Sequence, residues 1–429
     1  MLNRTVAPKI HEIKKLTIPP VEYYMLDNGV QVCEVNMGSL EVLKIEIVHV
    51  AGRTMEDKRS TARSTASLLK EGCGSLSSAD IHEAIDFYGA GLKAGSNMDF
   101  SYTSLHTMTK FAPELINLVG EMYNNPTFPD IELKKFKEIN IENLKEEFTK
   151  NNVLIYRKIT EEIFGKDNPY GYNSMPYDYQ AITKEDIYHH YNTYYGSDNM
   201  YIFISGKVDP STRMLINQTF GQTIKTTPKK IITPNATVIR KAQEIVHSPN
   251  LHQNSIAIGR GLFDRHHADN VPFFVTNTLL GGYFGSRLME VIREDKGWTY
   301  DISSSIDQML YDGCFYITSE AAPEFIAPIL KETYHQMELL RNEKVKNKEL
   351  NMVKNYLMGI FMNMLDGPMN VSAFAKSMIL TGQKISDFEQ FIDEMQSLTP
   401  DKIRNCAQTY LNPDDMIEAI VTQNQLKNT

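Results

Sequence analysis

The segment ITKEDIYHHYNTYYGSDNM, residues 182–200, has a second copy in LTPDKIRNCAQTYLNPDDM, residues 398–416. The two copies align without a gap at an offset of 416 − 200 = 216, with six identities in 19 positions. The identical pairs are Thr183/Thr399, Ile187/Ile403, Thr193/Thr409, Tyr194/Tyr410, Asp198/Asp414 and Met200/Met416. A repeat of this length indicates that the chain consists of two homologous halves.

Shorter matches upstream extend the repeat. Residues 112–115 match residues 322–325 at an offset of 210, and residues 137–140 match residues 348–351 at an offset of 211. The drift from 210 to 216 is what small loop insertions produce. We predict a first half at residues 1–222 with an arm at its start, a linker at residues 223–240 that contains Pro228 and Pro234, and a second half at residues 241–429.

Hydrophobic periodicity predicts that each half is an α+β unit. In the first half the predicted strands are residues 23–26, 30–35, 42–50, 100–108 and 200–205, and the predicted helices are residues 63–69, 78–85, 113–122, 131–149 and 184–194. Asn28-Gly29 between the first two strands predicts a type I′ hairpin. The predicted fold is α+β in two homologous halves, each an antiparallel sheet with helices packed on one face.

Composition excludes several classes of protein. The chain has 429 residues, 42% of them hydrophobic and 23% charged, which is typical of a globular protein. A net charge of −9 without a Lys/Arg cluster argues against a nucleic-acid partner. No apolar run approaches the roughly 18 residues of a membrane span.

The cysteines and the N-terminus suggest a location. Four widely spaced cysteines without a CxxC pair are typical of free thiols in a reducing compartment. The first residues lack the apolar region of a signal peptide. We therefore expect a cytoplasmic protein, with a periplasmic one as the alternative if a leader has been removed.

The segment LLGGYFGSRL, residues 279–288, is the most informative for function. It holds Gly281, Gly282 and Gly285 between two apolar stretches. A helix is predicted from about residue 286, with Gly297 ending it, and residues 298–300 are predicted to begin the next strand.

Arg293 would then lie late on the helix and Tyr300 early on the strand, where both can reach one surface. A guanidinium and a phenol hydroxyl suit a peptide carbonyl and a developing oxyanion. The alternative is a solvated helix arginine and a half-buried strand tyrosine. The repeat favours a functional role for this pair. At an offset of 208, Ile85 lies opposite Arg293 and Leu92 opposite Tyr300, so the fold itself does not require polar residues at these positions.

Motifs of other hydrolases are missing. The sequence contains no H-E-x-x-H, no H-x-x-E-H, no G-x-S-x-G and no P-loop, and His82-Glu83 has no second histidine at the required spacing. The eleven histidines are therefore expected to be surface or packing residues, and no metal ligand is assigned to this chain.

Together, these features resemble the insulinase/pitrilysin family of zinc peptidases, and in particular its processing-peptidase-like subunits of roughly 400 residues. The resemblance covers about residues 21–421. The segments that carry it are Leu26–Gly29, Ala51–Arg53, Asn168–Gly171 and Gly281–Tyr300, the last being the most specific.

The sequence departs from the family at the zinc motif. Where members that cut peptides have H-x-x-E-H before a glycine, here Gly72, this chain has Arg63, Ala66 and Ser67. The resemblance thus implies the non-zinc subunit of a heterodimeric peptidase, with zinc in a paralogous partner subunit and a peptide as substrate.

In such a pair, Arg293 and Tyr300 would bind substrate and stabilise the oxyanion, and the three glycines would form a flexible rim for the substrate. Two alternatives remain. The chain is a catalytically silent peptide-binding or structural homologue, or it forms a homodimer that binds peptides without cutting them.

Overall fold

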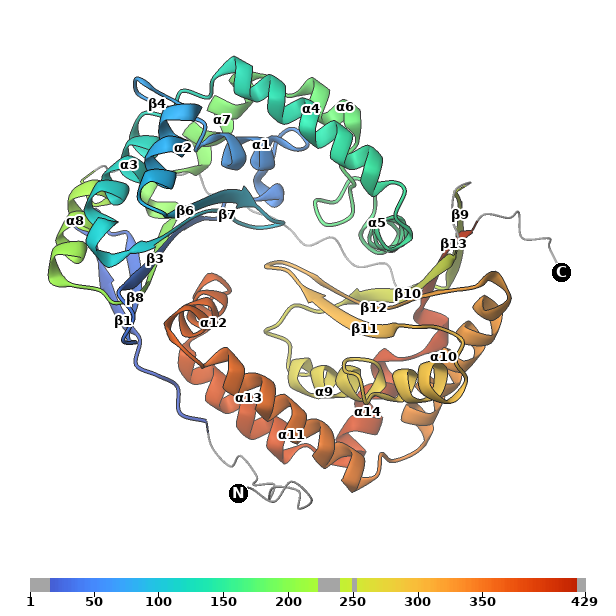
Figure 1. Ribbon diagram of the computed structural model, residues 1–429. Coiled ribbons are helices and arrows are strands. Elements are labelled where there is room, and N and C mark those ends of the chain that lie inside the picture. Colours follow the sequence, from blue (N-terminus) through green and yellow to red (C-terminus); the bar gives the residue numbers. More distant parts are fainter. Residues whose placement is uncertain (1–15, 223–239, 249–252, 423–429) are drawn as a thin grey trace, which may run out of the picture.

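The computed structural model describes residues 16–222, 240–248 and 253–422, and it contains two large sheets, each backed by helices (Figure 1). This arrangement confirms the predicted α+β fold class. The predicted linker, apart from Arg240, and the first 15 residues of the predicted arm lie outside the described residues. Among the described helices, none is both long and apolar enough to cross a bilayer.

The first sheet has the strand order β1-β2-β8-β3-β7-β6. Its strands are β1 (Glu22–Met25), β2 (Gln31–Asn36), β3 (Val42–His49), β6 (Gly91–Ser96), β7 (Ser101–Met108) and β8 (Met200–Gly206). Neighbouring strands are antiparallel except β2 and β8, which are parallel. One face packs on the apolar sides of α1 (Thr61–Leu68), α2 (Ser78–Phe87), α3 (Ala112–Asn124), α7 (Lys184–Tyr194) and α8 (Pro210–Phe220).

The second sheet has the order β11-β12-β10-β13-β9. Its strands are β9 (Ala242–His247), β10 (Asn254–Leu262), β11 (Ile302–Gln308), β12 (Gly313–Ala321) and β13 (Ile417–Thr422). Again one pair is parallel, here β9 and β13. One face packs on α9 (Asn270–Leu280), α10 (Ile326–Asn342) and α14 (Pro400–Tyr410). Outside α9 lie α11 (Asn347–Met364) and α13 (Ile385–Ser397).

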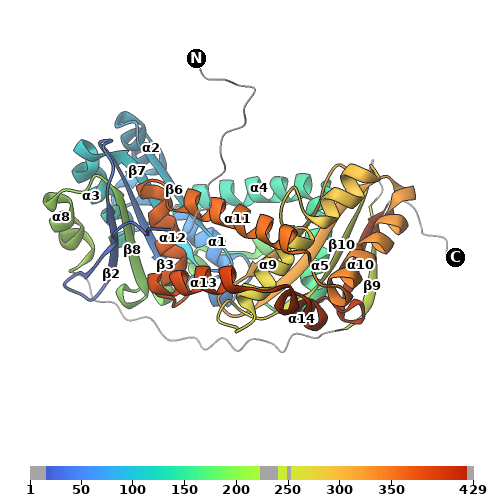
Figure 2. The ribbon, with the colours of Figure 1, turned by 90° about the horizontal axis from the view of Figure 1, so that it is seen from below.

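The other face of each sheet receives a helix from the opposite half. Helix α5 (Asn151–Phe164) follows α4 (Asp130–Glu147) but packs on β10, β12 and β13, with Ile155 and Ile159 against Ala257 and Ala419. Helix α12 (Pro368–Leu380) packs on β2 and β8, with Ala375 in their apolar cluster. The prediction of helices on one face therefore missed this exchange, which Figures 1 and 2 show from two sides.

The repeat is visible in helix capping. The hydroxyl of Thr183 accepts the backbone N–H of Asp186 at the start of α7, and that of Thr399 accepts the N–H of Lys402 at the start of α14. A hydroxyl at this position satisfies a backbone donor that has no partner inside the helix. Each helix is then followed by a 3-10 turn and a sheet strand, so the aligned segments form the same local structure.

The first hairpin differs from its predicted type. The N–H of Gly29 donates to the carbonyl of Leu26 at 2.9 Å, and Gly29 has φ +87° whereas Asn28 does not have a positive φ. A type I′ turn needs a positive φ at both central residues, so that prediction is wrong. The loop is a type I turn closed by a left-handed glycine. The Asn28 amide donates to the carbonyl of Phe220 at 2.8 Å, which ties the turn to α8.

Candidate functional site

Helix α1 contains the three residues at the degenerate zinc motif. Arg63 is exposed, Ala66 is buried and Ser67 is half-buried. A guanidinium has no lone pair for a metal and Ala66 has no heteroatom, so these residues do not fit zinc. Elsewhere in residues 16–222, 240–248 and 253–422, no group of three or more His, Cys, Asp or Glu side chains is arranged to hold a metal ion.

A half-buried carboxylate organises the start of α1. Glu56 accepts the backbone N–H groups of Ser60 and Ala62, both at 3.0 Å, and the hydroxyl of Tyr172 donates to it as well. Burial raises the pKa of Glu56 to about 7, although these donors and the nearby Arg53 act in the opposite direction. The guanidinium of Arg53 lies 4.4 Å from the centre of the Tyr172 ring. Helix α1, which contains the degenerate zinc motif, is therefore anchored at its start by a Glu/Tyr/Arg cluster.

The glycine-rich segment begins where α9 ends, and packing explains its first two glycines. The carbonyl of Gly281 accepts the N–H of Ser304 at 3.0 Å, and a Cβ on Gly281 would lie 2.7 Å from that nitrogen. A Cβ on Gly282 would lie 2.7 Å from the Cα of Thr278. Gly281 therefore allows the end of α9 to approach β11 closely, and Gly282 allows the chain to pass close to the last turn of α9. A role of Gly281, Gly282 and Gly285 in substrate binding stays a prediction.

The segment after the glycines matches the predicted helix but not the predicted strand. Arg287 and Leu288 begin a helix that continues as the π-helix η4 (Met289–Asp295), and Gly297 ends it with φ +63°. Residues 298–300 are not in a strand, because β11 starts at Ile302. The Thr299 hydroxyl donates to the carbonyl of Glu320 at 2.6 Å and so replaces strand pairing at this point.

Arg293 and Tyr300 both lie on this segment, but no hydrogen bond or ring contact joins these two described residues. Arg293 donates to Glu294 at 2.7 Å, and its guanidinium lies 4.7 Å from the centre of the Phe284 ring in the glycine-rich segment. Tyr300 is 85% exposed. Arg293 is therefore associated with the glycine-rich segment, whereas Tyr300 projects from the entry to β11.

Tyr300 borders a groove of about 510 Å³ between α5 and the β11/β12 hairpin. Its other lining residues are Asn152, Ile155, Tyr156, Gln253, Asp301, Ser305, Tyr316, Thr318, Ser319 and Glu320. Residues 152–156 come from the first half and the rest from the second. No motif marked them in the sequence, because they meet only through the exchange of α5.

Comparison with known proteins finds similarity to proteins named as peptidases or zinc proteases. The family model described as "Peptidase M16 inactive domain" matches residues 181–357. The Bacillus subtilis protein named uncharacterized zinc protease YmxG is 20% identical over 403 residues, covering 92% of this chain and 96% of that protein. An uncharacterized zinc protease of Rickettsia felis is 21% identical over 346 residues, covering 77% and 81% of the two chains.

Two solved structures share the fold over almost the whole chain. A peptidase M16 inactive domain from Pseudomonas fluorescens superposes with a TM-score of 0.84 at 21% identity, covering 95% of this chain and all of that one. A protease from Helicobacter pylori gives a TM-score of 0.86 at 17% identity, covering 94% of this chain and all of that one.

Proposed function

We propose that this chain belongs to the M16 (insulinase) peptidase family and is the non-zinc subunit of a two-chain zinc metalloendopeptidase. The observation that carries the proposal is a contrast within one chain. The residues at the zinc-motif positions, Arg63, Ala66 and Ser67, cannot bind the metal. Tyr300, by contrast, borders a groove, and Arg293 contacts the glycine-rich segment. A chain that kept only the fold would need neither polar residue there, as Ile85 and Leu92 in the other half illustrate.

In the proposed heterodimer the partner subunit would bind zinc, and the zinc would activate the water that attacks the peptide bond. In this chain the exposed Tyr300 hydroxyl would donate to the oxyanion that forms on the attacked carbonyl. A preorganised donor of this kind is typically worth about 3–4 kcal/mol in the transition state. Arg293 uses one Nη atom for Glu294, and its other donors would hold a main-chain carbonyl of the substrate.

The sheet edge beside Tyr300 suggests how a peptide would bind. Strand β11 is at the edge of the second sheet, and it begins two residues after Tyr300. An extended peptide can add to such an edge through main-chain hydrogen bonds, which depend little on side-chain identity. We therefore propose that specificity for the peptide sequence is loose.

The alternative is a catalytically silent peptide-binding or structural homologue, alone or as a homodimer. Loss of the zinc motif favours it. The peptidase activity of the nearest zinc-motif paralogue distinguishes the two functions. An accessory subunit raises this activity when it is added, whereas a silent homologue does not.

The test measures cleavage of a quenched fluorescent peptide by this chain, by its zinc-motif paralogue from the same source, and by the mixture. We expect activity mainly in the mixture. Tyr300→Phe should lower kcat of the mixture by roughly 100-fold or more with unchanged assembly, as removal of an oxyanion donor does. Tyr23→Phe, at a tyrosine that is 55% exposed on β1, is the matched control.

Unchanged kcat in Tyr300→Phe would remove this residue from the chemistry. Failure of the two chains to form a complex would reject the two-chain peptidase in favour of the silent homologue.

A further inference from the structure

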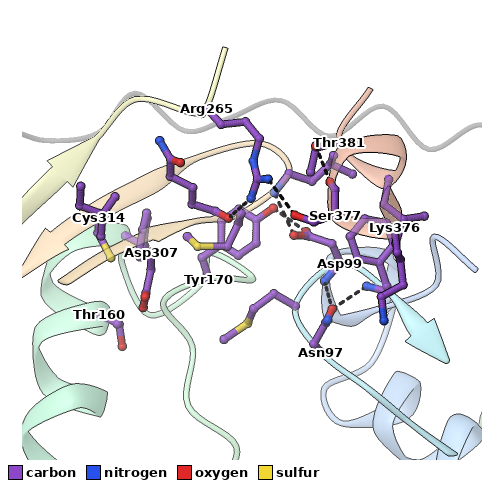
Figure 3. Close-up of a pocket in the computed structure, with 18 of the residues that line it drawn as sticks. Asn97, Asp99, Thr160, Tyr170, Arg265, Asp307, Cys314, Lys376, Ser377 and Thr381 are labelled. Carbon is purple, nitrogen blue, oxygen red and sulfur yellow. Dashed lines mark hydrogen bonds between the residues drawn. The ribbon is translucent and has the colours of Figure 1, made fainter. Parts of the chain in front are cut away.

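A second cavity, of about 540 Å³, lies where the two halves meet (Figure 3). The first half contributes the β6/β7 turn, α5 and the loop at Tyr170. The second half contributes Arg265 after β10, the β11/β12 hairpin and α12. Cavities of this size at such junctions are typical of sites for small ligands or peptide ends.

Much of the wall is apolar. The apolar side chains are Met98, Phe100, Phe164, Ile306, Met309, Leu310 and Leu380. A ligand that fills the cavity must therefore have an apolar body, because burying a polar one here would leave its groups without partners.

The two carboxylates of the cavity are already satisfied. Asp99 accepts the Tyr170 hydroxyl at 2.6 Å and the N–H of Leu310 at 2.9 Å. Asp307 accepts the Tyr156 hydroxyl at 2.7 Å. Asp307 also accepts the Tyr316 hydroxyl at 3.4 Å, and Asp99 interacts electrostatically with Arg265. The cavity therefore already holds a cation that faces Asp99, which argues against a cationic ligand there.

The cations differ in their remaining capacity. Lys376 is paired with the buried carboxylate of Glu46 at 2.5 Å. Arg265, by contrast, makes only two long hydrogen bonds, at 3.3 Å to the carbonyl of Gln308 and at 3.4 Å to the hydroxyl of Ser377. Its Nε is buried without a partner among the described residues.

Asp99 and Asp264 attract the charge of Arg265, but neither accepts a hydrogen bond from it among the described residues. A guanidinium offers five donors in a planar fork, so Arg265 has unused donors for an acceptor. Figure 3 shows its side chain reaching down toward Asp99 and Tyr170 beside Ser377. Unsatisfied donors in a partly buried site are best matched by a carboxylate, which accepts two parallel N–H bonds from one arginine.

We propose that this cavity binds the C-terminal carboxylate of an apolar peptide, with Arg265 as the carboxylate-binding residue and the apolar wall receiving the last side chains. The carboxylate follows from the geometry around Arg265. The choice of a peptide rests on the proposed function.

The test uses isothermal titration of this chain alone with N-acetyl-Leu-Leu-Phe as the free acid and as the carboxamide. We expect the acid to bind at least about tenfold more tightly, the factor typical of one charge-assisted hydrogen-bond pair. Arg265→Gln should bring the ratio of the two affinities close to one. Arg404→Gln, at an arginine on α14 that pairs with Asp401, should leave the ratio unchanged.

Equal affinities for acid and amide in the unaltered chain, or no binding of either, would overturn the proposal without any variant. An unchanged ratio in a folded Arg265→Gln would also overturn it. If that variant does not fold, Arg265→Lys replaces it, and the loss of the fork should still lower the ratio. The partner subunit is not in this assay. A negative result would therefore reject the carboxylate site without testing the proposal of a two-chain peptidase.

Discussion

Replacing Glu56 by Gln should flatten the dependence of folding stability on pH between about 5 and 8. In the folded protein the pKa of Glu56 is raised from 4.5 to about 7, a difference of 7 − 4.5 = 2.5. The folded state thus holds this proton more tightly than the unfolded chain. The contribution of Glu56 to stability is largest while its carboxyl is protonated, falls as the pH rises from about 4.5 to 7, and changes no further above that range.

The size of the effect follows from the same difference. At about 1.4 kcal/mol per pKa unit, ionisation of Glu56 costs roughly 3 kcal/mol of unfolding free energy. Glutamine keeps one carbonyl acceptor for the backbone N–H groups that start α1, but it does not ionise. At pH 5 the variant should therefore have a lower unfolding free energy than the unaltered protein. At pH 8 this difference should shrink or reverse, because the unaltered protein has lost the contribution of protonated Glu56.

Urea unfolding at a series of pH values measures this difference. The matched control is Glu138→Gln, at a glutamate on α4 whose side chain is 64% exposed, and it should follow the pH profile of the unaltered protein. Parallel profiles for Glu56→Gln and the unaltered protein would refute the reasoning, because Glu56 would then have nearly the same pKa in the folded and unfolded states.

Three further substitutions test the packing. Gly281→Ala should lower the free energy of unfolding by roughly 2–3 kcal/mol, because the new Cβ would lie 2.7 Å from the Ser304 nitrogen. An unchanged midpoint of urea unfolding would contradict this contact. Gly359→Ala, on α11 with nothing within 4 Å of the new Cβ, should instead stabilise the protein by about 0.5–1 kcal/mol in the same measurement. Lys376→Met should cost roughly 1–3 kcal/mol, since the buried Glu46 loses one of two cations; equal stability would mean that Lys44 alone suffices.

The helices and strands that local sequence patterns predicted in the first half are present in the structure, because such patterns depend on short-range physics. The capping boxes at Ser77 and Thr183 and the alternation in β3 and β7 act within a few residues. The exchange of α5 and α12 could not be predicted in this way. The apolar side of a helix shows that it is buried, but not which sheet buries it.

The candidate site was only partly predictable for a related reason. Arg293 and Tyr300 were found through the glycine-rich segment and the repeat, yet the unpaired backbone at residues 298–300 depends on the side chain of Thr299 bonding across to β12. Arg265 and Asp99 come from opposite halves and carry no motif. Their proximity results from the tertiary fold alone.

The exchange of helices also has a consequence during synthesis. When β8 leaves the ribosome, the first sheet can form, but the face made by Cys33, Val48 and Phe203 has no cover until α12 is made much later in the chain. At about 5–20 residues per second the delay is on the order of ten seconds or more. Nascent chains that stop before residue 368 should therefore expose this apolar sheet surface to solvent.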